Sequence, residues 1–327
     1  MLKRHGDFKA QLQRVSGQKV RTEPAMTSKT SEQPHLLVFG PGYSASAFIK
    51  TAVANRWAVS ATWRQEKAVP AIEALGATPV AYSLDALAAS IPSDAVTHIL
   101  VSIAPQPDGD PVLNFFKSWI ASCPNLRWVG YLSSTNVYGD HGGAWVDETS
   151  ETKPSLDRGK RRLDAENSWT QLGTDMDVAV HIFRLAGIYG QERNALKTVR
   201  GGKARRVIKP GQVFGRIHRD DIASALWLAA NSETQNNIFN LSDDLPSPPQ
   251  DVISEAARLL GVAIPPEIPI DDADLSPMGR SFYAENKRVK NQKAKDILGW
   301  QLAYPDYKQA LAKILEIEKK PIRNRLK

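Results

Sequence analysis

The chain has 327 residues, of which 42% are apolar and 24% charged, a balance typical of a globular protein with a large buried core. Its formal net charge of +7 is concentrated at the two ends. Residues 1–33 carry +4 and residues 319–327 carry +5, which leaves −2 for the body between them. Because the body has no excess of basic residues, we expect no nucleic-acid partner.

The sequence also limits the cellular compartment and the cofactors. Its one cysteine, Cys123, cannot form an internal disulfide, and no cysteine–histidine cluster has metal-ligand spacing. No stretch approaches the ~18 consecutive apolar residues that span a bilayer, and the N-terminus lacks the apolar core of a signal peptide. These features predict a soluble, cytoplasmic protein without a metal site or a membrane partner.

Residues 1–33 are polar, rich in Lys, Arg, Gln, Ser and Thr, and show no apolar periodicity. A segment with so little apolar surface cannot offset the entropy of ordering it, so we interpret it as a disordered tail. A targeting peptide, or translation that begins at Met26, would explain the same composition, and both remain open.

From His35 onward, short apolar runs alternate with segments of helical periodicity, which indicates repeated βαβ units. Helices are expected to begin near Ser44, Arg64, Pro111 and Leu156, and another is expected over residues 220–230. Strands are expected at residues 36–39, 58–62, 78–81, 98–102, 127–132, 178–183 and 237–241. This pattern predicts an α/β fold, with a doubly wound (Rossmann) parallel sheet of about seven strands over residues 34–245.

The composition changes after Leu241, where aspartates and prolines between residues 243 and 249 mark a boundary. Helices are expected at residues 250–260, 291–298 and 306–317, with a proline-rich stretch at residues 265–269. This is too little chain for a second full domain, so residues 246–327 should form a small C-terminal substrate lobe with a basic tail. Because ligands of open α/β sheets bind outside the carboxyl ends of the strands, the lobe should cover the substrate cleft.

A glycine turn connects the first strand directly to the first helix, in the sequence Gly40-Pro41-Gly42-Tyr43-Ser44-Ala45. Gly40 allows the tight turn, Gly42 lets the backbone approach a pyrophosphate, and Ala45 keeps the helix close to the strand. The unpaired N–H groups at the start of the helix would face the phosphates. We therefore expect this turn, Tyr43 and Ser44 included, to bind a dinucleotide; the alternative is an ordinary βα turn.

The residue at the end of the second strand indicates which dinucleotide the turn should bind. Arg64 stands where NAD-binding chains usually carry a carboxylate for the ribose hydroxyls. A guanidinium matches the 2′-phosphate of NADP, so NADP is the predicted cofactor and NAD the less preferred one, unless Arg64 is only a solvated surface residue. Four further residues should flank the adenine and ribose of the cofactor: Asp85, Ser102, Ile103 and Ala104.

Several segments further along the chain carry a family resemblance. They are Ser133-Ser134-Thr135-Asn136-Val137-Tyr138-Gly139, Asp147-Glu148, Arg184-Leu185-Ala186-Gly187-Ile188-Tyr189-Gly190, Ile217-His218-Arg219-Asp220-Asp221-Ile222, Asn240-Leu241-Ser242-Asp243 and Leu298-Gly299-Trp300. In this order they resemble the extended short-chain dehydrogenases/reductases, the NAD(P)-dependent epimerase/dehydratase branch, over residues 35–318. The resemblance implies a nicotinamide cofactor, and it implies structural rather than catalytic roles for His218 and Asp221.

The chain departs from this family at the catalytic position. The family uses a Tyr-x-x-x-Lys pair on the helix after the fifth strand, where the phenol exchanges a proton and the lysine lowers its pKa. Alignment on Leu163 and Glu166 places Arg158 at the tyrosine position and Arg162 at the lysine position. A guanidinium does not release a proton near neutral pH, so Arg158 cannot replace the phenol as a proton donor.

Other residues near this position could take part. Ser134 matches the family's serine or threonine that hydrogen-bonds the substrate, although a strand-end serine can equally satisfy the local backbone. Tyr138 and His141 follow it, and either could replace the missing proton donor. A Tyr-x-x-x-Lys sequence at Tyr283–Lys287 lies in the expected lobe, and we interpret it as a coincidence, with Tyr283 at most a residue of the substrate cleft.

The leading hypothesis is an NADP-dependent oxidoreductase or epimerase-like enzyme that acts on a small carbonyl or hydroxyl substrate. Ser134 would orient the substrate, and Arg158 and Arg162 would bind or polarise it, which suits a carboxylate or phosphate group. The alternative is a catalytically silent NADP-binding sensor or regulatory protein, because a shared fold does not establish a shared reaction. The oligomeric state stays open, with a homodimer as one option.

Overall fold

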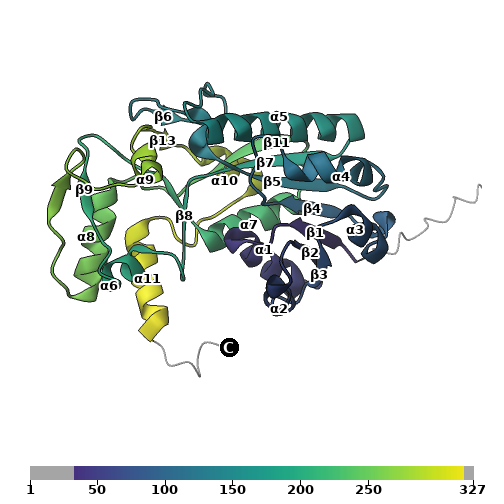
Figure 1. The fold of residues 1–327 in the computed structure, drawn as a ribbon, viewed down its shortest axis with the longest axis horizontal. Coiled ribbons are helices and arrows are strands. Elements are labelled where there is room, and N and C mark those ends of the chain that lie inside the picture. Colours follow the sequence, from purple (N-terminus) through teal and green to yellow (C-terminus); the bar gives the residue numbers. More distant parts are fainter. Residues whose placement is uncertain (1–32, 320–327) are drawn as a thin grey trace, which may run out of the picture. The chain divides into compact units, whose positions relative to one another are not determined.

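A parallel sheet of seven strands forms the centre of the computed structural model, which describes residues 33–319 (Figure 1). Its strands are β1 (His35–Phe39), β2 (Ala58–Trp63), β3 (Thr78–Ala81), β4 (His98–Val101), β5 (Trp128–Ser134), β7 (Ala179–Leu185) and β11 (Asn237–Leu241). They are ordered β11-β7-β5-β4-β1-β2-β3, and every neighbouring pair is parallel. The predicted α/β fold with a doubly wound sheet of about seven strands is confirmed.

Helices cover both faces of this sheet. Because successive side chains of a strand point to opposite faces, Leu36 and Val38 of β1 belong to one core and Leu37 and Phe39 to the other. The first core is covered by α1 (Tyr43–Ala54), α2 (Val69–Glu73), α7 (Arg219–Ala230) and α10 (Gln292–Leu298). The second is covered by α3 (Leu84–Ser90), α4 (Pro111–Ala121) and α5 (Asp157–Met176).

The strand order reverses between β1 and β4, which are neighbours in the sheet. Phe39 lies opposite Val101, so the glycine turn after β1 and the loop after β4 leave the sheet side by side. The N–H of Ser102 donates to the carbonyl of Phe39 at 3.0 Å. Such a reversal opens a crevice at the carboxyl edge of the sheet, the place where nucleotides bind in these folds.

Several segments differ from the sequence prediction. The helix expected near Arg64 is only a 3₁₀ turn, η1 (Glu66–Ala68), and the short α2, which ends before Gly76, a residue with a φ of +80°. The helix α3 was not predicted, although Ser83 caps it by accepting a hydrogen bond from the N–H of Ala86 at 3.2 Å. Strands β5 and β7 run two residues further than expected, which brings Ser134 to the carboxyl edge.

The C-terminal lobe has a core of its own. Its elements are α6 (Ala195–Arg200), β9 (Arg206–Ile208), α8 (Pro249–Leu260), β12 (Glu267–Pro269), α9 (Pro277–Phe282) and α11 (Tyr307–Lys319). Leu196 of α6 packs with Ala256 of α8 and with Leu311 and Ile314 of α11. The elements α6 and β9 pack here although they precede residue 245 in the chain, and the division at residue 245 stays a prediction. Residues 1–32, almost all of the predicted tail, and residues 320–327 lie outside the described residues.

Short elements connect the lobe to the sheet. Near the carboxyl edge lie η3 (Thr135–Tyr138) and two parallel pairs, β8 (Gly187–Tyr189) with β10 (Arg216–His218) and β6 (Trp145–Val146) with β13 (Arg288–Val289). A further 3₁₀ turn, η2 (Ser93–Ala95), precedes β4. None of the helices within residues 33–319 has the length and apolar character to cross a membrane.

Asp221 anchors the returning C-terminal chain to α7. Its side chain is buried, and its carboxylate accepts hydrogen bonds from the N–H groups of Ala303 at 2.7 Å and Tyr304 at 3.1 Å. The indole N–H of Trp300 donates to the carbonyl of Asp221 and to the hydroxyl of Ser224. These bonds fix the segment that leads into α11, and thus the position of the lobe's core.

We predict that Asp221→Ala lowers the free energy of unfolding by about 2–4 kcal/mol, because two N–H groups of the anchored segment lose their acceptor. In thermal unfolding followed by circular dichroism this should appear as a drop of several degrees. Asp220→Ala, at an exposed neighbouring aspartate, is the control and should change little. Equal effects of the two substitutions would contradict the anchoring role.

Candidate functional site

The glycine turn has a geometry that only glycine permits at its first position. Gly40 has a φ of +81°, and its N–H donates to the Thr62 hydroxyl of β2 at 3.2 Å. A Cβ at Gly40 would lie 2.7 Å from the Ile103 side chain. The N–H of Gly42 closes the turn on the carbonyl of Gly40 at 2.8 Å. Gly40 and Ile103, both predicted to bind the cofactor, are therefore in contact.

The start of α1 is open to a ligand. Gly42 is its N-cap, no side chain caps the helix, and no acidic residue lies in its first turn. A Cβ at Gly42 would meet only the Ser102 hydroxyl, 4.0 Å away, so packing alone does not require glycine there. An open cradle beside a helix N-terminus fits the diphosphate of a dinucleotide. Ala45 is fully buried under the turn, as its proposed packing role requires.

The predicted 2′-phosphate residue lies at the adjoining strand ends. Arg64 is exposed, and its guanidinium lies 4.7 Å from the centre of the Tyr82 ring. Tyr82 is itself fixed, because its hydroxyl donates to the carbonyl of Pro111 at 2.9 Å. Asp85, in the first turn of α3, and Ala104, in the loop after β4, are both exposed. An arginine held on a ring at this edge is available to a phosphate.

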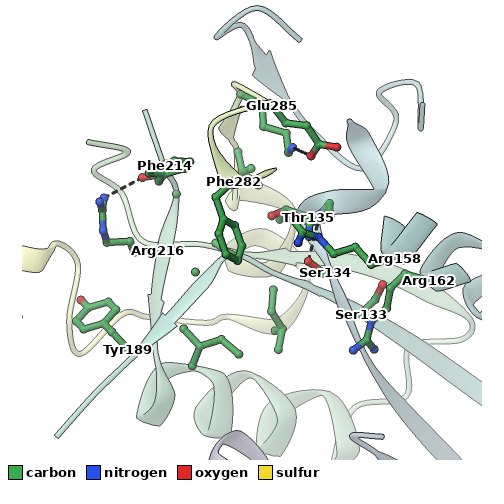
Figure 2. A pocket seen from close by; sticks show the side chains of 18 of the residues that line it. Ser133, Ser134, Thr135, Arg158, Arg162, Tyr189, Phe214, Arg216, Phe282 and Glu285 are labelled. Carbon is green, nitrogen blue, oxygen red and sulfur yellow. Dashed lines mark hydrogen bonds and ion pairs between the residues drawn. The ribbon is translucent and has the colours of Figure 1, made fainter. Parts of the chain in front are cut away.

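A cavity of about 730 Å³ adjoins this turn and lies between the sheet and the lobe (Figure 2). Ser44 and Ser102 line it on the side of the glycine turn. From the sheet and α5 it is lined by Ser133, Ser134, Thr135, Arg158 and Arg162, and from later segments by Tyr189, Arg193, Phe214, Arg216, Phe282, Tyr283, Glu285 and Lys287, among others. The structure thus brings all three predicted catalytic residues, Ser134, Arg158 and Arg162, to one cavity.

The two arginines of α5 differ in what they contact. Arg162 donates through Nη1 to the carbonyl of Leu132 and to the hydroxyl of Tyr131, the latter at 3.3 Å. The Arg158 side chain makes no hydrogen bond within residues 33–319, its buried Nε included, and its guanidinium lies 4.7 Å from the centre of the Phe282 ring. Arg162 therefore supports the end of β5, whereas Arg158 keeps its donors for a ligand.

Ser134 combines both roles considered for it. Its Oγ accepts a hydrogen bond from the N–H of Asn136 at 3.2 Å, which caps η3. The hydroxyl also lines the cavity, and its own proton has no acceptor among the described residues. Ser134 can thus donate to a substrate oxygen while the backbone holds its Oγ in place.

The suggested substitute donors Tyr138 and His141 do not line the cavity. The Tyr138 hydroxyl donates to the Asn240 side chain at 2.8 Å, and burial raises the pKa of Tyr138 to about 12. The His141 ring contacts the carbonyl of Tyr138 at 3.0 Å. Because Tyr138 is already engaged in a buried hydrogen bond, the structure corrects this suggestion. Tyr138, the last residue of η3, is fully buried rather than facing the cavity.

Sequence reasoning gave no role to the polar residues that the later segments contribute, except Tyr283, which it allowed as a residue of the substrate cleft. Tyr283 and Lys287 both line the cavity, and Lys287 forms a buried ion pair with Glu285 at 2.9 Å. Phe282 extends from the lobe into the middle of the cavity in Figure 2. The Tyr-x-x-x-Lys spacing was the only signal in the sequence, and it was set aside because the segment lies beyond the last sheet strand.

Tyr189 and Arg216 line the cavity, and the charge of the buried Asp243 acts on both of them. Arg216 donates to the carbonyls of Phe214 at 2.9 Å and Ser247 at 3.1 Å. Asp243 is 1% exposed, and neither its Oδ2 nor the Tyr189 hydroxyl has a hydrogen-bond partner within residues 33–319. Burial raises the pKa of Asp243 to about 8, although the Arg216 charge opposes this shift. No group of three or more metal-ligating side chains occurs in this described part of the chain.

Comparisons with solved structures give a family relationship and a wider fold relationship. A functionally unknown conserved protein from Silicibacter pomeroyi DSS is 44% identical, with a TM-score of 0.82 over 87% of this chain and 99% of that one. The dTDP-glucose 4,6-dehydratase from Bacillus anthracis, solved with NAD, is 15% identical, with a TM-score of 0.68 over 86% of this chain and 96% of that one. UDP-N-acetylglucosamine 4-epimerase from Bacillus cereus is 14% identical, with a TM-score of 0.68 over 88% and 100%. A scan of protein-family models and a search of curated proteins gave no match.

The buried carboxyl group of Asp243 predicts a pH dependence of stability. Its pKa of about 8 in the folded chain exceeds the ~4 of an unfolded aspartate, so the folded state binds this proton more tightly. Stability should therefore fall as the pH rises from about 4 through about 8. We expect Asp243→Asn, which abolishes the ionisation, to raise the free energy of unfolding by roughly 4–5 kcal/mol more at pH 8.5 than at pH 4.5, because ~1.4 kcal/mol accompanies each pKa unit.

Urea unfolding at the two pH values measures this difference. Asp94→Asn, at an exposed aspartate, is the control and should have no pH-dependent effect. A gain in stability that is the same at both pH values would contradict the assigned ionisation.

Proposed function

We propose that this chain is an NADP-dependent oxidoreductase or epimerase-like enzyme that acts on a small anionic carbonyl or hydroxyl substrate. It belongs to the same family as the conserved Silicibacter pomeroyi protein, and it has the fold of the NAD-dependent epimerases and dehydratases. The observation that carries the proposal is the Arg158 guanidinium, which has no hydrogen-bond partner within residues 33–319 and lines a cavity adjoining the glycine turn. An unpaired guanidinium in such a place favours a carboxylate or phosphate ligand.

In this proposal the glycine turn holds the cofactor. Gly40 and Gly42 admit the diphosphate against the N-terminus of α1, and Arg64, supported by Tyr82, binds the 2′-phosphate. The bound cofactor supplies or accepts a hydride. The cavity that begins at Ser44 and Ser102 is where the substrate would meet it.

The substrate would be bound by complementary charge. Arg158, Arg193 and Arg216 all line the cavity, and Arg193 has no hydrogen bond or ion pair from its side chain among the described residues. The carboxylate of Glu285 is already neutralised by Lys287, so the cavity keeps an excess of positive charge. Ser134 would then donate to the substrate oxygen, while Arg162 supports the strand that carries Ser134.

A silent NADP-binding sensor is the alternative, and one observation favours it. The helix α5 carries an arginine where the family places its tyrosine, so the usual proton donor is absent from it. Following NADPH oxidation with small aldehydes, ketones and 2-keto acids distinguishes the two. Turnover that is lost in Ser134→Ala supports the enzyme, and tight NADPH binding without any turnover supports the sensor.

We predict that NADP binds more tightly than NAD and that Arg64→Asp reduces or inverts this preference. Loss of a charged contact to phosphate should cost about 1.5–3 kcal/mol, roughly ten- to a hundredfold in affinity. Calorimetric titration with both cofactors measures the preference. Arg127→Asp, at an exposed arginine before β5 on the opposite edge of the sheet, is the control. Equal affinities in the unaltered protein would remove this argument.

We also predict that Arg158→Gln weakens the binding of anionic substrates selectively. The KM for a 2-keto acid should rise about tenfold or more, because one charged hydrogen bond is lost, while the KM for a neutral ketone of similar size changes little. Arg161→Gln is the matched control, because Arg161 lies on the same helix but does not line the cavity. A similar rise for both substrates would show that Arg158 shapes the cavity without binding charge.

A further inference from the structure

The proposed reduction of a carbonyl requires a proton donor. The candidates for this role are the ionisable groups that line the cavity. They are Arg158, Arg162, Tyr189, Arg193, Arg216, Tyr283, Glu285 and Lys287. The four arginines stay charged near neutral pH. Burial raises the pKa of both tyrosines, the opposite of what the family's catalytic phenol needs. Of these groups, Glu285 and Lys287 remain.

Lys287 is held firmly at the cavity wall. It is 9% exposed, and its Nζ donates to the carbonyl of Gly139 at 2.7 Å and to Glu285 at 2.9 Å. Glu285 is 6% exposed and accepts a second hydrogen bond from the Ser155 hydroxyl at 2.8 Å. An ammonium has a third N–H, and within residues 33–319 it has no acceptor. That proton is the one available to a ligand in the cavity.

The charges around Lys287 act in both directions. Burial, the largest effect, lowers the pKa of Lys287, and the positive charge of Arg158 on α5 lowers it further. The carboxylates of Glu285 and Asp140 raise it. The net direction is downward, which makes a lysine a better proton donor at neutral pH. Arg158 and Lys287 therefore influence each other, although one comes from α5 and the other from the segment before β13.

We infer that Lys287 is the proton donor of this cavity, positioned by Glu285, in place of the tyrosine that α5 lacks; this rests on the proposed function. As the carbonyl carbon gains a hydride from a reduced nicotinamide, the C=O π pair forms an O–H bond with a proton from Nζ. The lysine is left as a neutral amine and recovers a proton from solvent. In the oxidative direction the neutral amine accepts the hydroxyl proton.

Two measurements on the full chain test this assignment. The first is pulse acetylation between pH 6 and 11, read by mass spectrometry, which reports the pKa of each lysine without any substrate. We expect Lys287 to be acetylated at a lower pH than Lys290, which forms a 3.7 Å ion pair with Asp147 and is half-exposed. NADPH should protect Lys287 but not Lys290. A Lys287 that titrates like Lys290, or only above pH 10, overturns the assignment.

The second measurement is NADPH oxidation with propanal, butanone, pyruvate and 2-oxoglutarate as probes. Lys287→Arg keeps the charge and can keep both hydrogen bonds but cannot release a proton, so kcat should fall about a hundredfold or more with NADPH affinity unchanged. Lys290→Arg should leave kcat unchanged. Glu285→Gln removes a carboxylate that stabilises the ammonium, so the alkaline fall in the reduction rate should move to lower pH.

The outcomes separate this inference from the proposed function. Turnover that Lys287→Arg leaves intact overturns the assignment of Lys287 and leaves the enzyme proposal standing. If the unaltered chain turns over none of the probes while binding NADPH, the enzyme proposal and this inference fail together. A pH profile that Glu285→Gln leaves in place overturns the positioning role of Glu285.

Discussion

The buried ion pair between Glu166 and Arg184 fixes the helix on which the site depends. Glu166 of α5 accepts bonds from Arg184 of β7 at 2.8 and 3.2 Å and from the Ser133 hydroxyl of β5. Residues 158, 162 and 166 recur at every fourth position, so they share one face of α5. The pair fixes the rotation of α5 about its own axis. As a result, the Arg162 side chain contacts the end of β5 and the Arg158 side chain points into the cavity. Breaking a buried pair leaves an uncompensated charge, which makes this orientation costly to change.

The same network explains why Tyr138 cannot serve the cavity. The Arg184 guanidinium lies 4.8 Å from the centre of the Tyr138 ring, whose hydroxyl is bonded to Asn240. Glu148 in turn accepts a hydrogen bond from the N–H of Asn240 at 2.7 Å. These bonds connect η3, β7 and β11 in a largely buried region, although Arg184 Nη1 and Asn240 Nδ2 have no hydrogen-bond partner within residues 33–319, and they hold Tyr138 in place. The polar groups left for chemistry are those on the cavity side of β5 and those of the later segments.

The sheet and the glycine turn could be predicted because their signals are local. Residues 78–81 and 237–241 were predicted as strands with the bounds that the structure has, and the turn at Gly40 follows from a strand, two glycines and a helix in succession. The position of Glu285 and Lys287 at the cavity could not be predicted. Lys287 donates to the carbonyl of Gly139, which lies 148 residues earlier in the chain, and no local sequence pattern indicates that contact. The role of Arg162 was likewise hidden, since its partner is a backbone carbonyl that any residue at position 132 would supply.

Contacts connect the C-terminal segments that line the cavity to α5 and to the residues just before it. Phe282 from the lobe lies on the Arg158 guanidinium, and Glu285 accepts a bond from Ser155, just before α5 begins. On the proposed assignment, Arg158 of α5 binds the substrate's anionic group and Lys287, from the segment before β13, supplies the proton. An arginine at the tyrosine position requires such an arrangement, because α5 can bind the substrate but cannot give it a proton. The lobe would then supply both the cover of the cleft and the acid, so the reaction would depend on these contacts as much as on the glycine turn.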